Sequence, residues 1–231
     1  MSEKIPTKNE EPIPCKLILV GESGVGKTSI ISCYLSKHQE KIESTLGAYF
    51  SNKLVIIDGY KIKFEIWDTA GQEQYRSINA LFYKDACICL MVYDITDKRT
   101  FDCLRDYWYE SVSENGLQGV IFGVAGNKND LFEEEEVDEN EVKEFCKSIN
   151  ACFQLTSAQS YSSIDEIFRR LGEKFINSDF MKELIPKYVN NKNITKNEDE
   201  DNLKQIDNIK ITKETVLIRD IKADESRSKC C

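Results

Sequence analysis

Residues 21–28 read GESGVGKT, which satisfies the phosphate-binding pattern GxxxxGK[ST] between an apolar run and a helical pattern. The glycines let backbone N–H groups point into one concavity, and a helix N-terminus adds positive partial charge there. Lys27 is expected to bind the β and γ phosphates, and the Thr28 hydroxyl is expected to bind Mg²⁺. The candidate phosphate-site residues are Gly21, Glu22, Ser23, Gly24, Val25, Gly26, Lys27, Thr28 and Ser29.

A second segment, WDTAGQE at residues 67–73, ends a strand-like stretch, so a sheet would deliver its side chains toward the phosphate loop. Asp68 is expected to reach Mg²⁺ through water. Gly71 can bring its N–H group to the γ phosphate, and Gln72 follows where an attacking water needs orienting. ATPases, kinases and GTPases all use the phosphate loop, so these segments leave the base unidentified.

The base is indicated by NKND at residues 127–130, which follows an apolar run and fits the spacing NKxD. A carboxylate at Asp130 can accept hydrogen bonds from N1–H and the 2-amino group of guanine, whereas adenine offers no such pair of donors. Asn127 is expected to tether neighbouring loops, and the stem of Lys128 is expected to cover one face of the base. Ser157 and Ala158, in TSA, are candidates for a backbone contact to guanine O6.

Composition limits the classes of protein and of partner. The 231 residues, 41% of them hydrophobic, suit one main domain with an extension. A net charge of −9 argues against nucleic acid as a partner, because phosphate neutralisation needs clustered Lys and Arg. Nine cysteines without a CxxC pair indicate neither a zinc site nor a disulfide framework. No apolar run approaches the ~20 residues that span a bilayer, so we expect a cytosolic protein.

Three continuous apolar runs predict strands that are buried on both faces, as in a parallel sheet: residues 16–20, 87–93 and 120–126. Between residues 50 and 67, two strand-like segments flank Asp58-Gly59, a dipeptide that favours a tight hairpin turn and therefore an antiparallel pair.

Helical spacing recurs between these strands. It occurs around residues 101–108, and the spacing of a capping box predicts helix starts at Asp138 with Glu141 and at Ser163 with Glu166. The last helix carries one apolar stripe, made of Ile164, Ile167, Phe168, Leu171 and Phe175. The pattern predicts a flexible N-terminus (1–12), one α/β domain (13–185) and a flexible polar tail (186–231).

The ordered motifs GESGVGKT, STLGAYF, WDTAGQE, NKND and TSA resemble those of a Rab-family small GTPase of the Ras superfamily, over about residues 13–177. STLGAYF and KFEIWDTAGQE are most similar to the endosomal branch. The resemblance implies the P-loop NTPase small-GTPase fold, with a six-stranded, mostly parallel sheet, one antiparallel strand and five flanking helices. It also implies cycling between GTP and GDP states that regulates vesicular membrane trafficking, with slow intrinsic hydrolysis.

The resemblance implies further site residues. Thr45 would bind Mg²⁺ and the γ phosphate in the GTP state, and so act in catalysis with Gln72 and Lys27. Phe50, Trp67 and Phe82 align with the aromatic triad that Rabs present to effectors. Two nucleotide-site positions depart from the family. His38 stands where the family has an aromatic residue that packs on guanine. It therefore either shortens nucleotide residence or lies exposed in a loop. Gln159 stands where the family has a lysine whose stem lies beside the base.

The chain ends in Cys230 and Cys231, which is similar to the double-cysteine terminus on which many Rabs carry two geranylgeranyl groups. Two lipid chains give stable anchoring, whereas one gives only marginal attachment. The implied location is the cytoplasmic face of an intracellular membrane, with an endosome as the candidate compartment, and a cytosolic pool. The implied partners are a guanine nucleotide exchange factor, a GTPase-activating protein, effectors, a prenylation escort and GDP-dissociation-inhibitor chaperones.

Two alternatives stay open at the level of the sequence. One is a nucleotide-bound effector-binding module that does not hydrolyse GTP, and retention of Gln72 and Thr45 argues against it. The other is an adenine-nucleotide P-loop NTPase, which is disfavoured by Asp130 and by the lack of a substrate domain.

Overall fold

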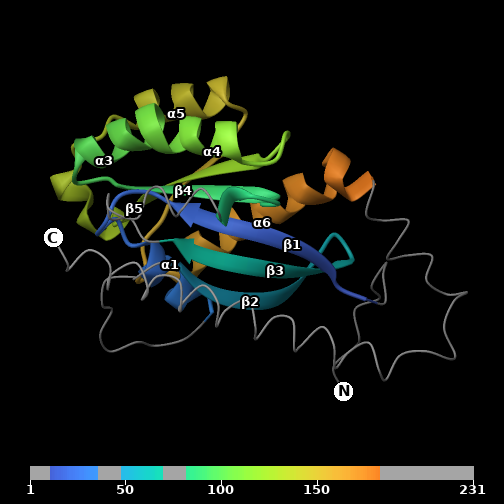
Figure 1. Ribbon diagram of the computed structural model, residues 1–231. Helices are drawn as coiled ribbons and strands as arrows, with labels where there is room; N and C mark the ends of the chain where they lie inside the picture. Colours follow the sequence, from blue (N-terminus) through green and yellow to red (C-terminus); the bar gives the residue numbers. More distant parts are fainter. Residues whose placement is uncertain (1–10, 36–47, 70–81, 183–231) are drawn as a thin grey trace, which may run out of the picture. The chain divides into compact units, whose positions relative to one another are not determined.

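The computed structural model describes residues 11–35, 48–69 and 82–182, and Figure 1 shows a central sheet with helices on both faces. The six strands lie in the order β2-β3-β1-β4-β5-β6, and all neighbours are parallel except β2 and β3. The strands are β1 (Ile13–Val20), β2 (Ala48–Ile57), β3 (Tyr60–Thr69), β4 (Ile88–Asp94), β5 (Ile121–Asn127) and β6 (Cys152–Leu155). The predicted mostly parallel sheet with one antiparallel pair is thereby confirmed.

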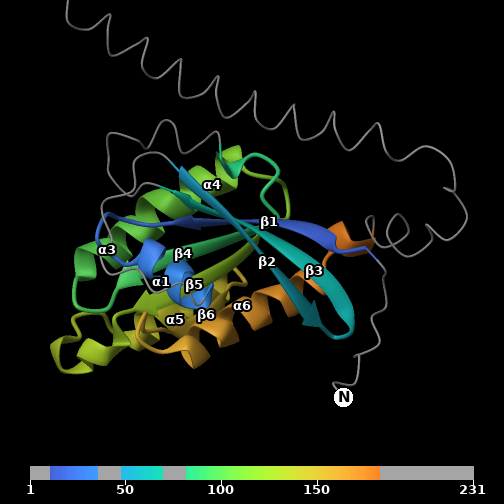
Figure 2. The same cartoon turned by 90° about the horizontal axis from the view of Figure 1, so that it is seen from below.

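Strand β1 lies inside the sheet and divides the core into two layers. Leu17 and Leu19 belong to one layer, while Ile18 and Val20 belong to the other, because successive side chains of a strand point to opposite faces. Helices α1 (Lys27–Tyr34) and α6 (Tyr161–Ile176) cover the first face. Helices α3 (Lys98–Cys103), η2 (Leu104–Trp108), α4 (Tyr109–Asn115) and α5 (Glu139–Ser148) cover the second. In the turned view of Figure 2, α3 and α4 lie across the sheet from α1 and α6.

The hairpin between β2 and β3 forms at the predicted dipeptide. Asp58 and Gly59 have φ angles of 49° and 79°, the positive values that a tight two-residue turn requires. The resulting register sets Phe50 opposite Trp67.

The helical spacing at residues 101–108 is correct, but it conceals an irregularity. Residues Leu104–Trp108 form a π turn, in which the backbone N–H of Tyr109 donates to the carbonyl of Leu104, five residues earlier. Single π turns inside α-helices are rare, and apolar periodicity does not reveal them.

The two predicted helix starts have different outcomes. Helix α5 begins after Asp138, whose side chain accepts a hydrogen bond from the Asn140 N–H, as an N-cap does. The start at Ser163 is wrong, because α6 begins at Tyr161 with Ser160 as its N-cap residue. The Ser163 hydroxyl instead donates to the Ser160 carbonyl and accepts from the Ser157 N–H, so it joins α6 to the preceding loop. The apolar stripe of α6 is buried as predicted.

A lysine clasp holds the edge strand β2 against two helices. Lys53 Nζ lies 3.6 Å from the ring centroid of Tyr34 and 5.1 Å from that of Tyr161. It also donates to the Tyr34 carbonyl oxygen at 2.6 Å and to the Tyr161 hydroxyl at 3.1 Å. Partial burial lowers the pKa of Lys53. The clasp joins the middle of β2 to the end of α1 and the start of α6.

Within the described ranges, no helix has both the length and the apolar character needed to cross a membrane.

Candidate nucleotide site

The carboxyl ends of four parallel strands bring the predicted motifs to one edge of the sheet. The register places Leu19 of β1 beside Asp68 of β3, and Asp94 of β4 beside Asn127 of β5. Ligands of open α/β sheets bind at this edge, because the loops that leave the strands converge there. Segments that are about 50 and 100 residues apart in the sequence thus share one site.

The phosphate loop encloses its lysine. Lys27 is 6% exposed, and its Nζ donates to the carbonyl oxygens of Gly21 and Glu22, each at 2.8 Å. Burial lowers the pKa of Lys27 to about 8, although the charges of Asp68 and Glu22 oppose the shift. The ammonium group therefore lies in a water-poor position, where a polyphosphate would be a strong counter-charge.

The other residues of this loop fall into two groups. Ser23 and Gly24 are exposed at its tip, whereas Val25 is buried beneath it. Gly26 comes immediately before α1, and Ser29 lies half-buried in the first turn of that helix. The loop is thus anchored at its base and open at its tip, as a cradle for an anion needs to be.

Two oxygen-bearing side chains that are candidates for Mg²⁺ are in direct contact. The Thr28 hydroxyl donates to Asp68 Oδ2 at 2.5 Å, and Asp68 is 1% exposed. The end of β3 is fixed by Thr69, whose hydroxyl donates to the Leu19 carbonyl at 2.6 Å. A hydroxyl and a carboxylate side by side are the oxygen donors that Mg²⁺ prefers, so the residues present fit this ion.

Asn127 tethers the loops, as the sequence predicts. Its Nδ2 donates to the Val25 carbonyl at 2.8 Å, and its Oδ1 accepts from the Thr156 hydroxyl at 3.3 Å. The amide is 1% exposed, so both bonds are shielded from water. One side chain thereby fixes the phosphate loop, the NKND segment and the TSA segment relative to one another.

The carboxylate of Asp130 meets the TSA segment. Its Oδ1 accepts from the Ser157 hydroxyl at 2.5 Å, and its Oδ2 accepts from Gln159 Nε2 at 3.2 Å. Half-buried Ala158 lies between these two donors in the sequence. Gln159 therefore does not merely remove the lysine stem that the family has at this position. Its amide donates a hydrogen bond to the carboxylate that is predicted to select the base.

Lys128 is oriented by an acidic residue that sequence reasoning missed. Lys128 has a φ of 67°, and its Nζ lies 2.5 Å from Asp94 Oδ2. The other oxygen of Asp94 accepts from the N–H and the hydroxyl of Thr96, which fixes the carboxylate. Only the position of Asp94 could have indicated this role. Asp94 is the last residue of β4, and the neighbouring strand β5 ends at Asn127 of the NKND segment.

The three aromatic residues of the predicted effector triad lie together. The ring centroids of Phe50 and Trp67 are 5.0 Å apart, and those of Trp67 and Phe82 are 5.6 Å apart. All three are half-buried, and Lys16 Nζ lies 5.4 Å from the Trp67 ring centroid. They form one contiguous aromatic cluster next to the end of β3.

Six predicted residues lie outside the described ranges: His38, Thr45, Gly71, Gln72, Cys230 and Cys231. Residues 1–10 of the predicted N-terminal segment and the whole predicted tail (186–231) lie outside these ranges as well.

Comparison with known proteins identifies the family. A model of the Ras family matches residues 16–177. The chain is 40% identical over 162 residues to a putative Rab-5B of Dictyostelium discoideum, which covers 70% of this chain and 75% of that protein. It is 36% identical over 165 residues to human Rab-22A, covering 71% and 84% respectively. It is also 36% identical to RabJ of Dictyostelium discoideum, of which the match spans 63%. With the site described above, these matches show that the chain belongs to the Ras family and is a small GTPase of the Rab type.

Proposed function

We propose that this protein binds GTP and GDP together with Mg²⁺ and switches between the two states to regulate vesicular membrane traffic. The observation that supports the proposal best is the convergence of three groups at one sheet edge. They are the loop around Lys27, the Thr28–Asp68 pair and the Asp130 carboxylate. Together these groups offer recognition of a polyphosphate, a divalent cation and a purine base.

Each group has a separate task in this proposal. The loop amides and the Lys27 ammonium hold the phosphates and stabilise the charge that develops during transfer. Asp130 selects guanine, and Ser157 fixes one of its carboxylate oxygens. Thr28 and Asp68 would hold Mg²⁺ together with Thr45, and the ion when bound neutralises charge on the phosphates. Gly71 and Thr45 would order their loops around the γ phosphate, so that hydrolysis releases them.

The experiment that tests this function is uptake of fluorescent GDP by the purified protein in magnesium-containing buffer. Unlabelled GDP should displace the label, whereas ATP at the same concentration should leave it bound. Displacement by ATP would favour the adenine-nucleotide alternative. The absence of any uptake would overturn the proposal.

Hydrolysis should be slow without a partner and should depend on Gln72. We expect Gln72→Leu to lower the single-turnover rate of GTP hydrolysis by about tenfold or more, because leucine cannot orient the attacking water. GDP affinity should stay unchanged. Rapid-quench measurement of phosphate release would check the rate, and equal rates in the two proteins would remove Gln72 from the mechanism and favour the non-hydrolysing module.

Regulation of membrane traffic requires a target membrane and regulatory proteins, and we propose candidates for each. Rab-5B and Rab-22A, matched above, support the proposed endosomal location on the cytoplasmic face of a membrane, in exchange with a cytosolic pool. The aromatic cluster of Phe50, Trp67 and Phe82 is the proposed effector contact. The proposed regulators are an exchange factor and a GTPase-activating protein. The escort and GDP-dissociation-inhibitor chaperones would handle the lipidated form.

Lipidation at the terminal cysteines is the proposed anchor. We expect the variant Cys230→Ser/Cys231→Ser to move entirely to the soluble fraction, because it lacks both sites for a geranylgeranyl chain. Each single variant should retain only weak, reversible attachment. Fractionation and imaging of an N-terminally tagged protein would measure this, and full membrane association of the double variant would contradict the assignment.

A further inference from the structure

Glu22 places a carboxylate inside a loop that is proposed to bind an anion. Its Oε1 accepts from the indole Nε1–H of Trp108 at 3.0 Å and from the Cys103 thiol at 3.0 Å. Its backbone carbonyl accepts from Lys27 Nζ at 2.8 Å. Glu22 therefore contacts two parts of the molecule. Its main chain binds Lys27, and its side chain binds residues of α3 and η2.

The π turn explains how both donors reach one oxygen. Cys103 and Trp108 are five residues apart, and in a regular α-helix such residues point about 140° away from each other. The π turn at Leu104–Trp108 joins residues five apart by a backbone hydrogen bond, so that they lie nearer to the same side than in an α-helix. The irregularity thus aims a thiol and an indole at Glu22.

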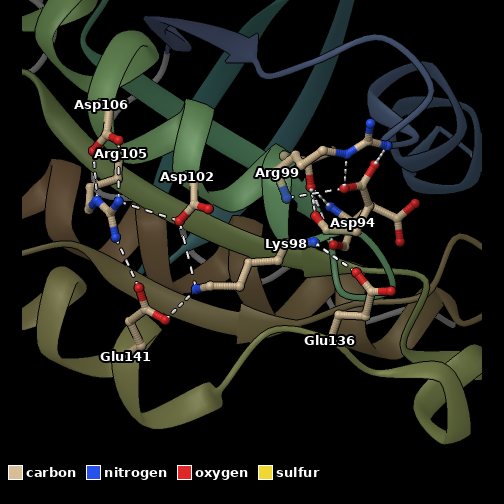
Figure 3. Close-up of polar contacts among 10 residues, drawn as sticks. Asp94, Lys98, Arg99, Asp102, Arg105, Asp106, Glu136 and Glu141 are labelled. Carbon is tan, nitrogen blue, oxygen red and sulfur yellow. Dashed lines mark hydrogen bonds and ion pairs between the residues drawn. The ribbon is translucent and has the colours of Figure 1, made fainter.

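The π turn is also fixed from its outer side. Figure 3 shows Arg105, within this turn, between Glu141 of α5 and the acidic residues of its own helix. Arg105 Nη1 lies 2.9 Å from Glu141 Oε1, and its Nη2 lies 3.3 Å from Asp102 Oδ1. Lys98 joins the same Glu141 carboxylate at 2.5 Å. Trp108 is completely buried, so its indole has a defined position from which to hold Glu22.

The negative charge of Glu22 makes the hydrogen bonds from Trp108 and Cys103 important for nucleotide binding. A carboxylate that could turn toward bound phosphates would repel them, and in a partly buried site such repulsion is only weakly screened. Hydrogen bonds to a charged acceptor are stronger than bonds between neutral groups, so the indole is an effective restraint.

We propose that Trp108, with Cys103 assisting, is a positioning residue that holds the Glu22 carboxylate away from the phosphates, and that this restraint prolongs nucleotide residence. The inference rests on the proposed function, because it concerns the same phosphate loop. A purely structural role for Trp108 would instead be independent of the charge at Glu22.

A double-mutant cycle on GDP dissociation separates these two roles. We expect Trp108→Phe to raise the dissociation rate of fluorescent GDP about tenfold, because phenylalanine fills much of the space but donates no hydrogen bond. In a Glu22→Gln background, where no negative charge is left to restrain, the same substitution should change the rate by less than about twofold. Cys103→Ala should act in the same direction by about two- to threefold, and only when Glu22 is present. This variant keeps the test available should Trp108→Phe not fold.

Tyr109→Phe is the matched control, because Tyr109 is the next residue and packs on Phe122 and Phe145, away from Glu22. Its dissociation rate should equal that of the wild type. An equal increase for Trp108→Phe in both backgrounds, or no increase in either, would overturn the inference. Failure of the wild type to take up GDP would instead overturn the proposed function.

Discussion

Asp130→Asn should reverse the base preference of this protein from guanosine to xanthosine nucleotides. The carboxylate of Asp130 accepts from Ser157 and Gln159, and in the proposed complex it also accepts from the two N–H donors of guanine. An asparagine amide would face the guanine 2-amino group with a donor of its own, and two facing donors cannot form a hydrogen bond. Xanthine carries an oxygen at that position, which the amide can bind.

The loss of GDP affinity should reach about 10⁴-fold, the scale on which a site built for hydrogen bonds rejects a mismatched ligand. Competition of labelled GDP and labelled XDP with unlabelled nucleotides would measure both affinities. Glu134→Gln supplies a control, because it removes a carboxylate from an exposed position four residues further on and should leave the preference unchanged. An Asp130→Asn protein that still prefers GDP would contradict the base assignment.

Gly26→Ala should abolish tight GDP binding, whereas Gly24→Ala should weaken it only moderately. Both glycines have positive φ angles, 98° and 82°, so an alanine at either position is strained by about 1–2 kcal/mol. Only at Gly26 does the added Cβ meet another group, since it would lie 2.3 Å from Asn127 Nδ2, while at Gly24 it meets nothing within 4 Å. The alanine at residue 26 therefore has to displace the amide that tethers the phosphate loop to the NKND segment.

Breaking that buried hydrogen bond should weaken GDP binding by a further ~10- to 100-fold beyond the effect of Gly24→Ala. Titration of fluorescent GDP would give the affinities, and thermal unfolding would establish that both variants fold. In an Asn127→Ala background the additional penalty at Gly26 should disappear, because the amide it collides with is gone. Equal affinities of the two glycine variants would show that the tether does not govern binding.

The fold was largely predictable because five of the six described strands are either continuous apolar runs or part of a hairpin with a specific turn dipeptide, and only β6 is neither. The run at residues 16–20 predicts a strand buried on both faces, and β1 (Ile13–Val20) contains it. The start of α6 was not predictable from spacing, because Ser163 fits a helix cap and also fits a bond between α6 and its loop. The hydrogen bond that the Ser163 hydroxyl accepts from the Ser157 N–H depends on the path of the loop before α6, which residue spacing within the helix does not specify.

The residues of the candidate site also fall into a predictable and an unpredictable group. Motif residues such as Lys27, Asn127 and Asp130 occur at fixed spacings, so the sequence alone predicted them as candidate site residues. Asp94 and Trp108 belong to no motif, and each contacts a residue that is distant in the sequence. Asp94 pairs with Lys128, and Trp108 donates to Glu22. Gln159 shows the limit most directly, since its spacing indicated a missing lysine stem but not a hydrogen bond to Asp130.

The lysine clasp on β2 sets a boundary within that strand. Phe50, in the aromatic cluster, precedes Lys53, whereas the hairpin at Asp58 follows it. To lift or slide past Lys53, the strand would have to withdraw a cation from the faces of two tyrosines and break two hydrogen bonds. In the proposed switch, a rearrangement that starts at the nucleotide would therefore end at this anchor, and the part of the hairpin beyond Lys53 would keep its place.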